Sequence, residues 1–246
     1  MNIAIAYSPN WKQYIPILLY SIIKNNINPM KIYLLSESDG ELKLEIDYVQ
    51  FIDCNKIYNQ RIQKETNVDN RITKFALYRL LLPELIQDDK ILYLDVDIIV
   101  NGNIQELYDI DIENYYVAGV SDIGIDRAAL MPHLGLNLDD IYINSGVILL
   151  NLKNIRKDLI YEKWIYEVNE HSYIGRDQSI INKTCKDKIK IIDNKFNVSI
   201  STGLNASENI IIHYTGIKPW VDNKVPNYNF WEKYKNEYLN SASLIL

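Results

Sequence analysis

Residues 90–100, KILYLDVDIIV, form an apolar run in which two carboxylates, Asp95 and Asp97, stand one residue apart. An acidic group inside such a run is costly to bury unless a cation compensates its charge. Alternate side chains of a β-strand share one face, so we expect Asp95 and Asp97 to point the same way. Two converging carboxylates suit a hard divalent cation such as Mg²⁺ or Mn²⁺. The stretch therefore predicts a core strand that ends in a metal site, although such pairs also occur in turns and helix caps.

Strand-like and helix-like segments alternate around this stretch, which predicts an α/β fold with crossover helices. We expect strands at residues 2–7, 30–35, 48–54, 116–120, 141–152, 188–193 and 210–214. We expect helices at residues 11–25, from Asn70 or Thr73 to 85–87, and at 153–170, 177–184 and 231–239. Residues 123–140, which contain Gly124, Pro132 and Gly135, are typical of a loop or lid over a site.

Composition limits the function classes. A chain of 246 residues with 48% hydrophobic and 24% charged residues is long enough for one large domain, which we expect to span 1–246. The net charge of −6 argues against a nucleic-acid partner. Cys54 and Cys185 stand alone, so a disulfide framework is not expected and a reducing cytoplasm is the default. We expect no signal peptide, because the N-terminus MNIAIAYSPN lacks positive charges and a long apolar run. We expect no membrane span, because the longest apolar candidate, Ile15 to Ile23, is interrupted by polar residues.

A second candidate ligand lies far downstream, where His213 ends the strand-like run IIIHYT. Imidazole is a good ligand for Mn²⁺ and could complete a site begun by two carboxylates. A single histidine at a strand end is more often structural. The compact string HYTGIKPW nevertheless favours a ligand, because Gly216 permits close backbone approach and Lys218 supplies a charge for phosphate. His133 and His171 lack such neighbours, and we expect both at the surface.

Polar residues in two further segments are candidates for contact with a ligand. Asn144 and Ser145 begin a strand-like run, where their burial requires hydrogen-bond partners, although a strand-entry turn would also explain them. Asp177 and Gln178 begin a helix, and Asp177 could simply be its N-cap. Gln178 offers a donor and an acceptor to a sugar hydroxyl or a developing cationic carbon.

Two charged residues lie in or beside the predicted sheet. Arg79 stands among apolar neighbours on the helix before the acidic strand, so we expect it to face an anion or a carboxylate. Asp122 follows the strand at 116–120. The strand ends of an α/β sheet are where ligands usually bind.

Four strings, YLDVDIIV, YINSGVILLNL, RDQSIIN and HYTGIKPW, together resemble glycosyltransferase family 8, the retaining enzymes of the lipopolysaccharide galactosyltransferase and glycogenin type. The resemblance extends from the first strand to Trp220. It implies a GT-A fold, a nucleotide-binding mixed sheet flanked by helices. It further implies a donor-binding core of about 1–122 and an acceptor-side, metal-completing part of about 123–246.

The resemblance also implies the site residues. Asp95, Asp97 and His213 look like the ligands of the Mn²⁺ (or Mg²⁺) that holds the diphosphate of a UDP-sugar. The residues similar to the family's nucleotide and diphosphate contacts are Ala6, Ser8, Asn10, Arg79, Gly216 and Lys218. Those similar to its donor-sugar pocket are Asp122, Asn144, Ser145, Asp177 and Gln178. The chain departs from many members at Ser8, where they have an acidic residue, and some members have two residues where only one separates Gly216 from Lys218.

The function implied by this resemblance is retaining transfer of glucose or galactose from UDP-glucose or UDP-galactose to a saccharide or glycolipid acceptor. The acceptor would be a bacterial surface glycan or lipooligosaccharide. The protein would be cytoplasmic, with at most peripheral contact at the inner face of the membrane. Two alternatives are a catalytically inactive sugar-nucleotide-binding module and a haloacid-dehalogenase-type phosphohydrolase. The second fits poorly, because its acidic strand normally opens the domain.

Overall fold

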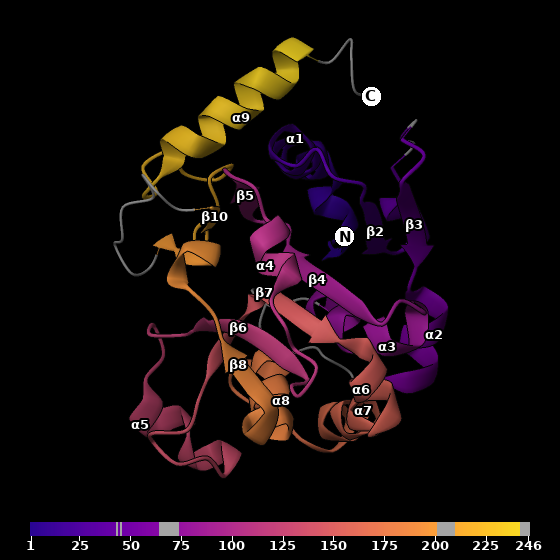
Figure 1. Cartoon of the computed structure of the whole chain (residues 1–246), viewed down its shortest axis with the longest axis vertical. Coiled ribbons are helices and arrows are strands. Elements are labelled where there is room, and N and C mark those ends of the chain that lie inside the picture. The colour runs from indigo at the N-terminus through magenta and orange to yellow at the C-terminus, as the bar shows by residue number, and fades with distance from the viewer. Residues whose placement is uncertain (43, 45, 64–73, 201–209, 242–246) are drawn as a thin grey trace.

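Apolar strands from both halves of the chain form one seven-stranded sheet in the computed structural model (Figure 1). The structure describes residues 1–42, 44, 46–63, 74–200 and 210–241. In spatial order the strands are β3 (Val49–Asp53), β2 (Lys31–Ser36), β1 (Asn2–Ala6), β4 (Lys90–Asp95), β7 (Ile143–Asn151), β6 (Val117–Ser121) and β8 (Ile189–Ile191). β7 runs antiparallel to both of its neighbours, and the other pairs are parallel. The predicted α/β class is therefore confirmed, with a mixed sheet.

Helices cover both faces of this sheet. One face packs against α2 (Asn55–Arg61), η3 (Lys74–Leu81), α3 (Leu82–Leu85), α6 (Leu152–Lys157), α7 (Ile160–Glu170) and α8 (Arg176–Cys185). The opposite face packs against α1 (Ile15–Asn25) and α4 (Gln105–Asp109). In β1, Ala4 and Ala6 join the first core and Ile3 and Ile5 the second. Burial on both faces explains why the strands are almost continuously apolar in sequence.

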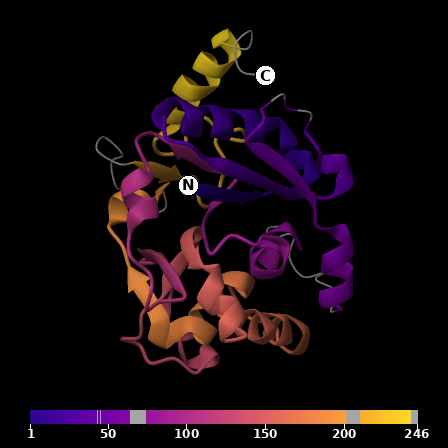
Figure 2. The same cartoon turned by 45° about the vertical axis from the view of Figure 1, so that its right-hand side comes forward.

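A smaller sheet carries the C-terminal part of the chain. Its strands are β5 (Ile98–Val100), β10 (Ile211–His213) and β9 (Val198–Ser199), with β5 antiparallel and β9 parallel to β10. The last helix, α9 (Tyr228–Ser241), lies beside α1 at the top of Figure 1. Trp231 and Tyr234 of α9 share an apolar cluster with Ile17 and Tyr20 of α1. Figure 2 shows α1 and α9 on the opposite side of the N-terminal strands from residues 152–185.

Several elements differ from the sequence expectations. The acidic stretch is two strands, because the chain turns at Val96 and Asp97 between β4 and β5. The expected helix at 153–170 is broken at Leu159, whose φ of 54° is left-handed. The expected helix at 11–25 begins as the 3₁₀ segment η1 (Pro9–Tyr14). The possible helix starts at Asn70 and Thr73 lie outside the described residues.

Residues 123–140 were expected to be irregular but contain α5 (Arg127–Leu130) and η4 (Pro132–Leu134). Leu130, Met131, Leu134 and Leu136 pack with Tyr142 in a small apolar cluster of their own. Helices α2 and α4 and strand β9 were not anticipated. Three further 3₁₀ turns are η2 (Ser38–Gly40), η5 (Lys186–Lys188) and η6 (Asn194–Phe196).

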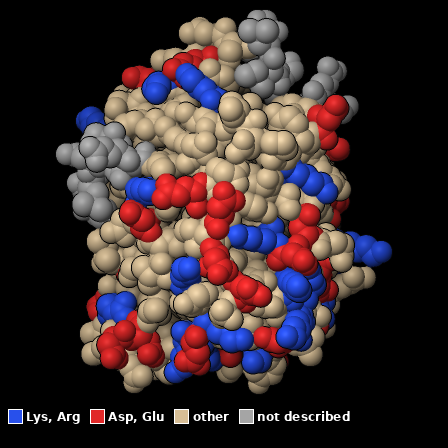
Figure 3. Space-filling view, in the orientation of Figure 1, with Lys and Arg blue, Asp and Glu red and all other residues tan. Residues whose placement is uncertain are grey.

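The surface and the helix lengths bear on possible partners. On the face drawn in Figure 3, acidic and basic side chains are interspersed. Within the described ranges, none of the helices combines the length and the apolarity that crossing a bilayer requires. Cys54 and Cys185 are buried free thiols, and His133 and His171 are both exposed, as expected for the two histidines.

Candidate active site

Two strand registers bring Asp95, Asp97 and His213 together. Asp95 ends β4 and pairs in register with Ala6 of β1. His213 of β10 pairs with Ile98 of β5, and the Tyr214 N–H donates to the Asp97 carbonyl at 2.9 Å. The two aspartates do not share the face of one strand, as the alternation had suggested. Instead, the turn after Asp95 directs the Asp97 side chain toward the same point.

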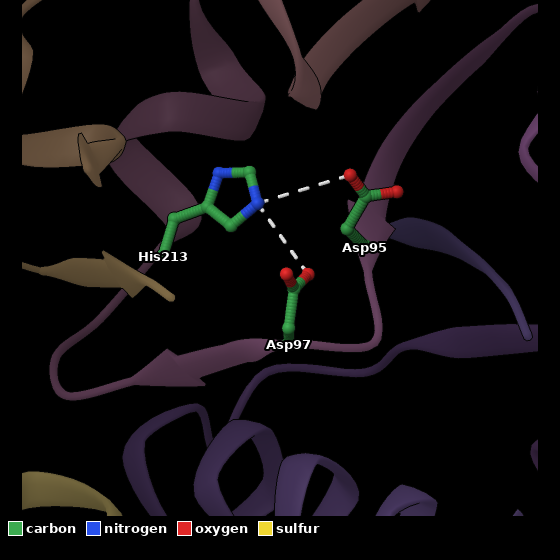
Figure 4. A group of neighbouring side chains, drawn as sticks. All are labelled: Asp95, Asp97 and His213. Carbon is green, nitrogen blue, oxygen red and sulfur yellow. Dashed lines mark ion pairs between the residues drawn. The ribbon is translucent and has the colours of Figure 1, made fainter. Parts of the chain in front are cut away.

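The three side chains form a compact group of ligand atoms (Figure 4). His213 Nε2 lies 3.4 Å from Asp97 Oδ1 and 3.8 Å from Asp95 Oδ2. The three atoms lie within 4.8 Å of one another, and His213 and Asp97 are buried. Neighbouring ligands of one small divalent ion are separated by about 3 to 4 Å. Both distances from His213 Nε2 fall in this range, and a donor set of two carboxylates and an imidazole suits a divalent ion such as Mn²⁺ or Mg²⁺.

The second oxygen of Asp95 is held by other partners. Asp95 Oδ1 accepts hydrogen bonds from Arg79 Nη2 at 2.8 Å and from the Tyr93 hydroxyl at 2.9 Å. This leaves Oδ2 as the oxygen that faces His213 (Figure 4). Such outer contacts orient a metal-binding carboxylate before the ion arrives.

Gly146 makes room for this group of ligands. A Cβ atom at position 146 would lie 2.2 Å from His213 Cε1 and 2.7 Å from Asp95 Oδ2. Both distances are shorter than any normal contact. Only glycine at this position of β7 therefore allows the imidazole to approach Asp95.

Arg79 links Asp95 to a second acid, Asp177. Arg79 Nε lies 3.0 Å from Asp177 Oδ2, and its Nη1 donates to Ser145 Oγ at 2.9 Å. Burial would lower the pKa of Arg79, but Asp177 and Asp95 outweigh that effect and raise it. The expectation that Arg79 faces a carboxylate is confirmed. Because its charge lies between two acids, it compensates the cost of burying them.

Asp177 is not a helix N-cap, which was one of its two possible roles. Gly175, with a φ of 81°, precedes α8, and Asp177 lies in the first helical turn with its carboxylate directed to Arg79 and Ser145. Burial raises the pKa of Asp177, while the neighbouring Arg79 opposes that rise.

Lys218 completes the charged group from the side of β10. Its Nζ forms an ion pair with Asp97 Oδ2 and donates to the Tyr214 carbonyl at 3.1 Å. Burial alone would raise the pKa of Asp97, but the charge of Lys218 outweighs it and holds that pKa well below its usual range. Asp97 is therefore ionised at neutral pH, as a metal-binding carboxylate must be.

A cavity of about 240 Å³ lies against this group. It is lined by nine of the predicted site residues, which are Ala6, Ser8, Arg79, Asp95, Asp97, Ser145, Asp177, Gln178 and Lys218. Trp11, Phe75 and Tyr93 supply aromatic walls. Basic and acidic groups thus meet an apolar surface in one hollow, which is the usual make-up of a ligand site.

Asp122 and Asn144 lie beside a smaller cavity of about 30 Å³. Gln178 joins the two hollows, because its Nε2 donates to Asp122 Oδ2 at 3.0 Å and its Oε1 accepts from Asn144 Nδ2 at 3.2 Å. In the described part of the chain, Asn10 and Gly216 line neither cavity. Asn10 is exposed on η1, and Gly216 has a φ of 81° in an exposed turn.

Sequence reasoning assigned no role to four residues of this region: Trp11, Tyr93, Gly146 and Asn197. Tyr93 had a signal, because it stands two residues before Asp95 and so shares a strand face with it. Gly146 also had one, since it follows Asn144 and Ser145 directly. No local pattern marked Trp11 or Asn197.

Known proteins resemble the chain in both sequence and fold. Residues 2–224 match the model for glycosyl transferase family 8. A Haemophilus influenzae protein named as a glycosyltransferase is 30% identical over 260 residues, which cover 98% of this chain and 75% of the relative. The lipopolysaccharide 1,2-glucosyltransferase of Escherichia coli is 25% identical over 96% of this chain and 77% of its own length.

The fold is shared with a solved structure of the galactosyltransferase LgtC in complex with donor and acceptor sugar analogs. That comparison gives a TM-score of 0.78 at 20% identity and covers 98% of this chain and 96% of LgtC. The mixed sheet flanked by helices is thus a GT-A fold, as the sequence motifs implied. With the family match across nearly its whole length, this chain belongs to glycosyl transferase family 8.

Proposed function

We propose that this protein is a metal-dependent, retaining glycosyltransferase that transfers glucose or galactose from a UDP-sugar to a saccharide acceptor. The observation that carries the proposal is the group formed by Asp95, Asp97 and His213, whose ligand atoms lie within 4.8 Å of one another. Asp95 and Asp97 also line the cavity of about 240 Å³. Family membership supports a sugar-nucleotide donor and a saccharide acceptor.

Within this proposal, Asp95, Asp97 and His213 Nε2 hold Mn²⁺ or Mg²⁺. When bound, the ion neutralises the charge that develops on the departing diphosphate. Lys218, which lines the cavity, would add a second positive charge and contact phosphate oxygens. Uridine would bind beside Ala6, Ser8 and Asn10, and the diphosphate would lie along the turn that contains Gly216 and Lys218.

The donor sugar would lie toward Asp177, Gln178, Asn144 and Asp122. The C1–O bond to phosphate breaks, and its electron pair goes to the leaving phosphate oxygen. The acceptor oxygen then bonds to C1 from the same face and passes its proton to that phosphate oxygen. Asp177 is already engaged by Arg79 and Ser145, which favours an orienting role over a nucleophilic one. A covalent sugar trapped on Asp177 or Asp122 would contradict this route.

The acceptor is proposed to be a bacterial surface glycan or lipooligosaccharide, bound by the part of the chain from about residue 123 onward. The name of the Escherichia coli relative, a lipopolysaccharide 1,2-glucosyltransferase, supports this class of acceptor. The donor would be bound mainly by residues 1–122, which supply Ala6, Arg79, Asp95 and Asp97 to the cavity. We place the reaction in the cytoplasm or at the inner face of the membrane.

A thermal-shift panel tests the proposal. UDP-glucose, UDP-galactose, UDP-GlcNAc and GDP-mannose are each added with and without Mn²⁺. A ligand at about 100 times its Kd stabilises the native state by about 2.7 kcal/mol. We expect the full shift only when Mn²⁺ is combined with UDP-glucose or UDP-galactose. No shift with any UDP-sugar, or one that is independent of the metal, would contradict the proposal.

Two variants and a turnover assay complete the test. Asp97→Asn should abolish the metal-dependent part of the shift without unfolding the protein. Asp187→Asn, at an exposed aspartate in η5 that lines neither cavity, is the matched control and should behave as wild type. Release of UDP with a sugar acceptor distinguishes an active transferase from a module that only binds the nucleotide.

A further inference from the structure

The ring nitrogen of His213 that faces away from the carboxylates has a buried partner of its own. Figure 4 shows Nε2 directed at Asp95 and Asp97 and the second nitrogen on the opposite side of the ring. That nitrogen, Nδ1, lies 3.0 Å from Oδ1 of Asn197, a residue that is only 5% exposed. A neutral imidazole carries one proton, and only the nitrogen without it can bind a metal. The partner of Nδ1 therefore decides whether Nε2 is a ligand.

The orientation of the Asn197 amide follows from a backbone group. The N–H of Gly146 donates to Asn144 Oδ1 at 3.0 Å, and a backbone N–H can only donate. The same Asn144 oxygen lies 2.9 Å from the Asn197 side-chain nitrogen. If the Asn197 amide were reversed, two carbonyl oxygens would face each other at that distance. Asn197 must therefore present its NH₂ group to Asn144 and its oxygen to His213.

The other end of the network agrees with this direction. The Ser145 N–H donates to Gln178 Oε1 at 3.1 Å, which fixes the orientation of the Gln178 amide. Gln178 then donates from Nε2 to Asp122 Oδ2 at 3.0 Å, and an ionised carboxylate can only accept. From His213 toward Asp122, each side chain thus donates a hydrogen bond to the next one. The N–H groups of Gly146 and Ser145 set this direction, because each identifies the oxygen of a side-chain amide.

We propose that Asn197 is a positioning residue that holds His213 in the Nδ1–H tautomer and so directs the lone pair of Nε2 at Asp95 and Asp97. A histidine that binds a metal commonly donates its second N–H to a fixed acceptor, and loss of that acceptor weakens the site. In this chain the acceptor is an amide oxygen from the segment between η6 and β9. The expected effect of Asn197 on metal affinity rests on the proposed metal-binding function, whereas the assignment of the His213 tautomer does not.

The tautomer itself can be measured without a metal or a nucleotide. Long-range ¹H–¹⁵N correlation spectra of the metal-free protein are recorded at rising pH until the histidine signals no longer change, so that neutral imidazoles are compared. The chain has three histidines, and His213→Gln identifies the signal of interest. We expect Nδ1–H in the wild type and a shift toward Nε2–H in Asn197→Ala. Nε2–H in the wild type, or an unchanged Nδ1–H signal in Asn197→Ala, would overturn the inference.

A second variant applies if the alanine variant does not fold. Asn197→Asp keeps an oxygen acceptor for Nδ1–H but loses the donor to Asn144. We expect it to retain the Nδ1–H tautomer, and an Nε2–H signal in this variant would also refute the assignment.

Mn²⁺ affinity supplies the second readout, measured from free Mn²⁺ by electron paramagnetic resonance. Asn197→Ala should bind Mn²⁺ about 10 to 100 times more weakly than wild type. The matched control is Asn26→Ala, because Asn26 is 3% exposed and its side chain also makes two hydrogen bonds, to Ile22 and Ile104. Equal Mn²⁺ affinity in wild type and Asn197→Ala would show that Asn197 does not position His213. A wild type that binds no Mn²⁺ would instead contradict the proposed function, and the tautomer spectra would still decide the role of Asn197.

Discussion

Adding a single methyl group at Gly146 should disable the candidate metal site. In Gly146→Ala the new Cβ would lie 2.2 Å from His213 Cε1. Two carbon atoms pack at about 3.5 Å, so the imidazole or the backbone of β7 has to move by about 1 Å. His213 is 3% exposed and has little free space to move into. Ligand distances in a metal site tolerate changes of only about 0.2 Å, so a shift of this size removes the imidazole as a ligand.

The expected magnitude follows from this displacement. Overpacking of a buried position costs about 1 to 3 kcal/mol of unfolding free energy. In addition, we expect the Mn²⁺ affinity to fall about 10- to 100-fold, which corresponds to a loss of about 1.4 to 2.7 kcal/mol of binding free energy. Urea unfolding of the metal-free protein measures the first quantity. Titration with Mn²⁺ under native conditions measures the second.

Gly119→Ala is the matched control for overpacking. Its Cβ would lie 2.7 Å from Ile143 Cδ1 in the same sheet, and no ligand of the candidate metal site is among its nearest contacts. We therefore expect Gly119→Ala to lose stability but keep wild-type Mn²⁺ affinity. If Gly146→Ala binds Mn²⁺ as tightly as wild type, or if Gly119→Ala weakens binding equally, the argument from steric exclusion is refuted.

Three further variants test the charges around the site and the fold. Arg79→Met should lower the unfolding free energy by about 3 to 5 kcal/mol, because Asp177 and Asp95 lose their buried counter-charge. A urea unfolding midpoint equal to that of the wild type would contradict this. Tyr93→Phe removes one hydrogen bond to Asp95 Oδ1 and should weaken Mn²⁺ binding roughly 10-fold while the fold stays intact. Unchanged Mn²⁺ affinity would show that the hydroxyl does not orient the carboxylate. Burial would raise the pKa of Glu167, but hydrogen bonds from a tyrosine and a lysine outweigh it and lower the pKa. Its stabilising contribution is therefore fully present above the unfolded-state pKa of about 4.3 and is lost as the pH falls toward the lower folded-state value. Melting temperatures measured between about pH 7 and pH 3 should fall less steeply in Glu167→Gln, and parallel curves would refute the assignment.

Sequence patterns were sufficient for much of the fold. The core strands β1, β2, β4 and β7 are buried on both faces, so each is a short, continuous apolar run whose length is typical of a strand. Short helices such as α2 and α4 were missed, because five to seven residues carry too little periodicity to be recognised. The break at Leu159 was missed because the apolar pattern continues across it and nothing local marks a left-handed leucine.

The candidate site divides in the same way. The composition of each motif predicted the residue types of the site, because buried carboxylates and a histidine among apolar residues require a partner. The residues around those groups were assigned no role from the sequence. Tyr93 and Gly146 had local signals, because Tyr93 stands two residues before Asp95 and Gly146 directly follows Ser145. Asn197 had none, because its contacts with Asn144 and His213 join segments that are distant in sequence.

By itself, the amino-acid sequence determined that this chain forms an α/β sheet, that it belongs to glycosyl transferase family 8, and which residues are candidate ligands. Only the tertiary structure decided how these residues are arranged. It showed that Asp95 and Asp97 converge through a turn rather than along a strand and that Arg79 lies between two acids. It also placed an amide oxygen behind His213. The physical reason is that strand and helix patterns depend on local burial, whereas the direction of a hydrogen bond or the room for an imidazole depends on atoms that folding brings together from distant parts of the chain.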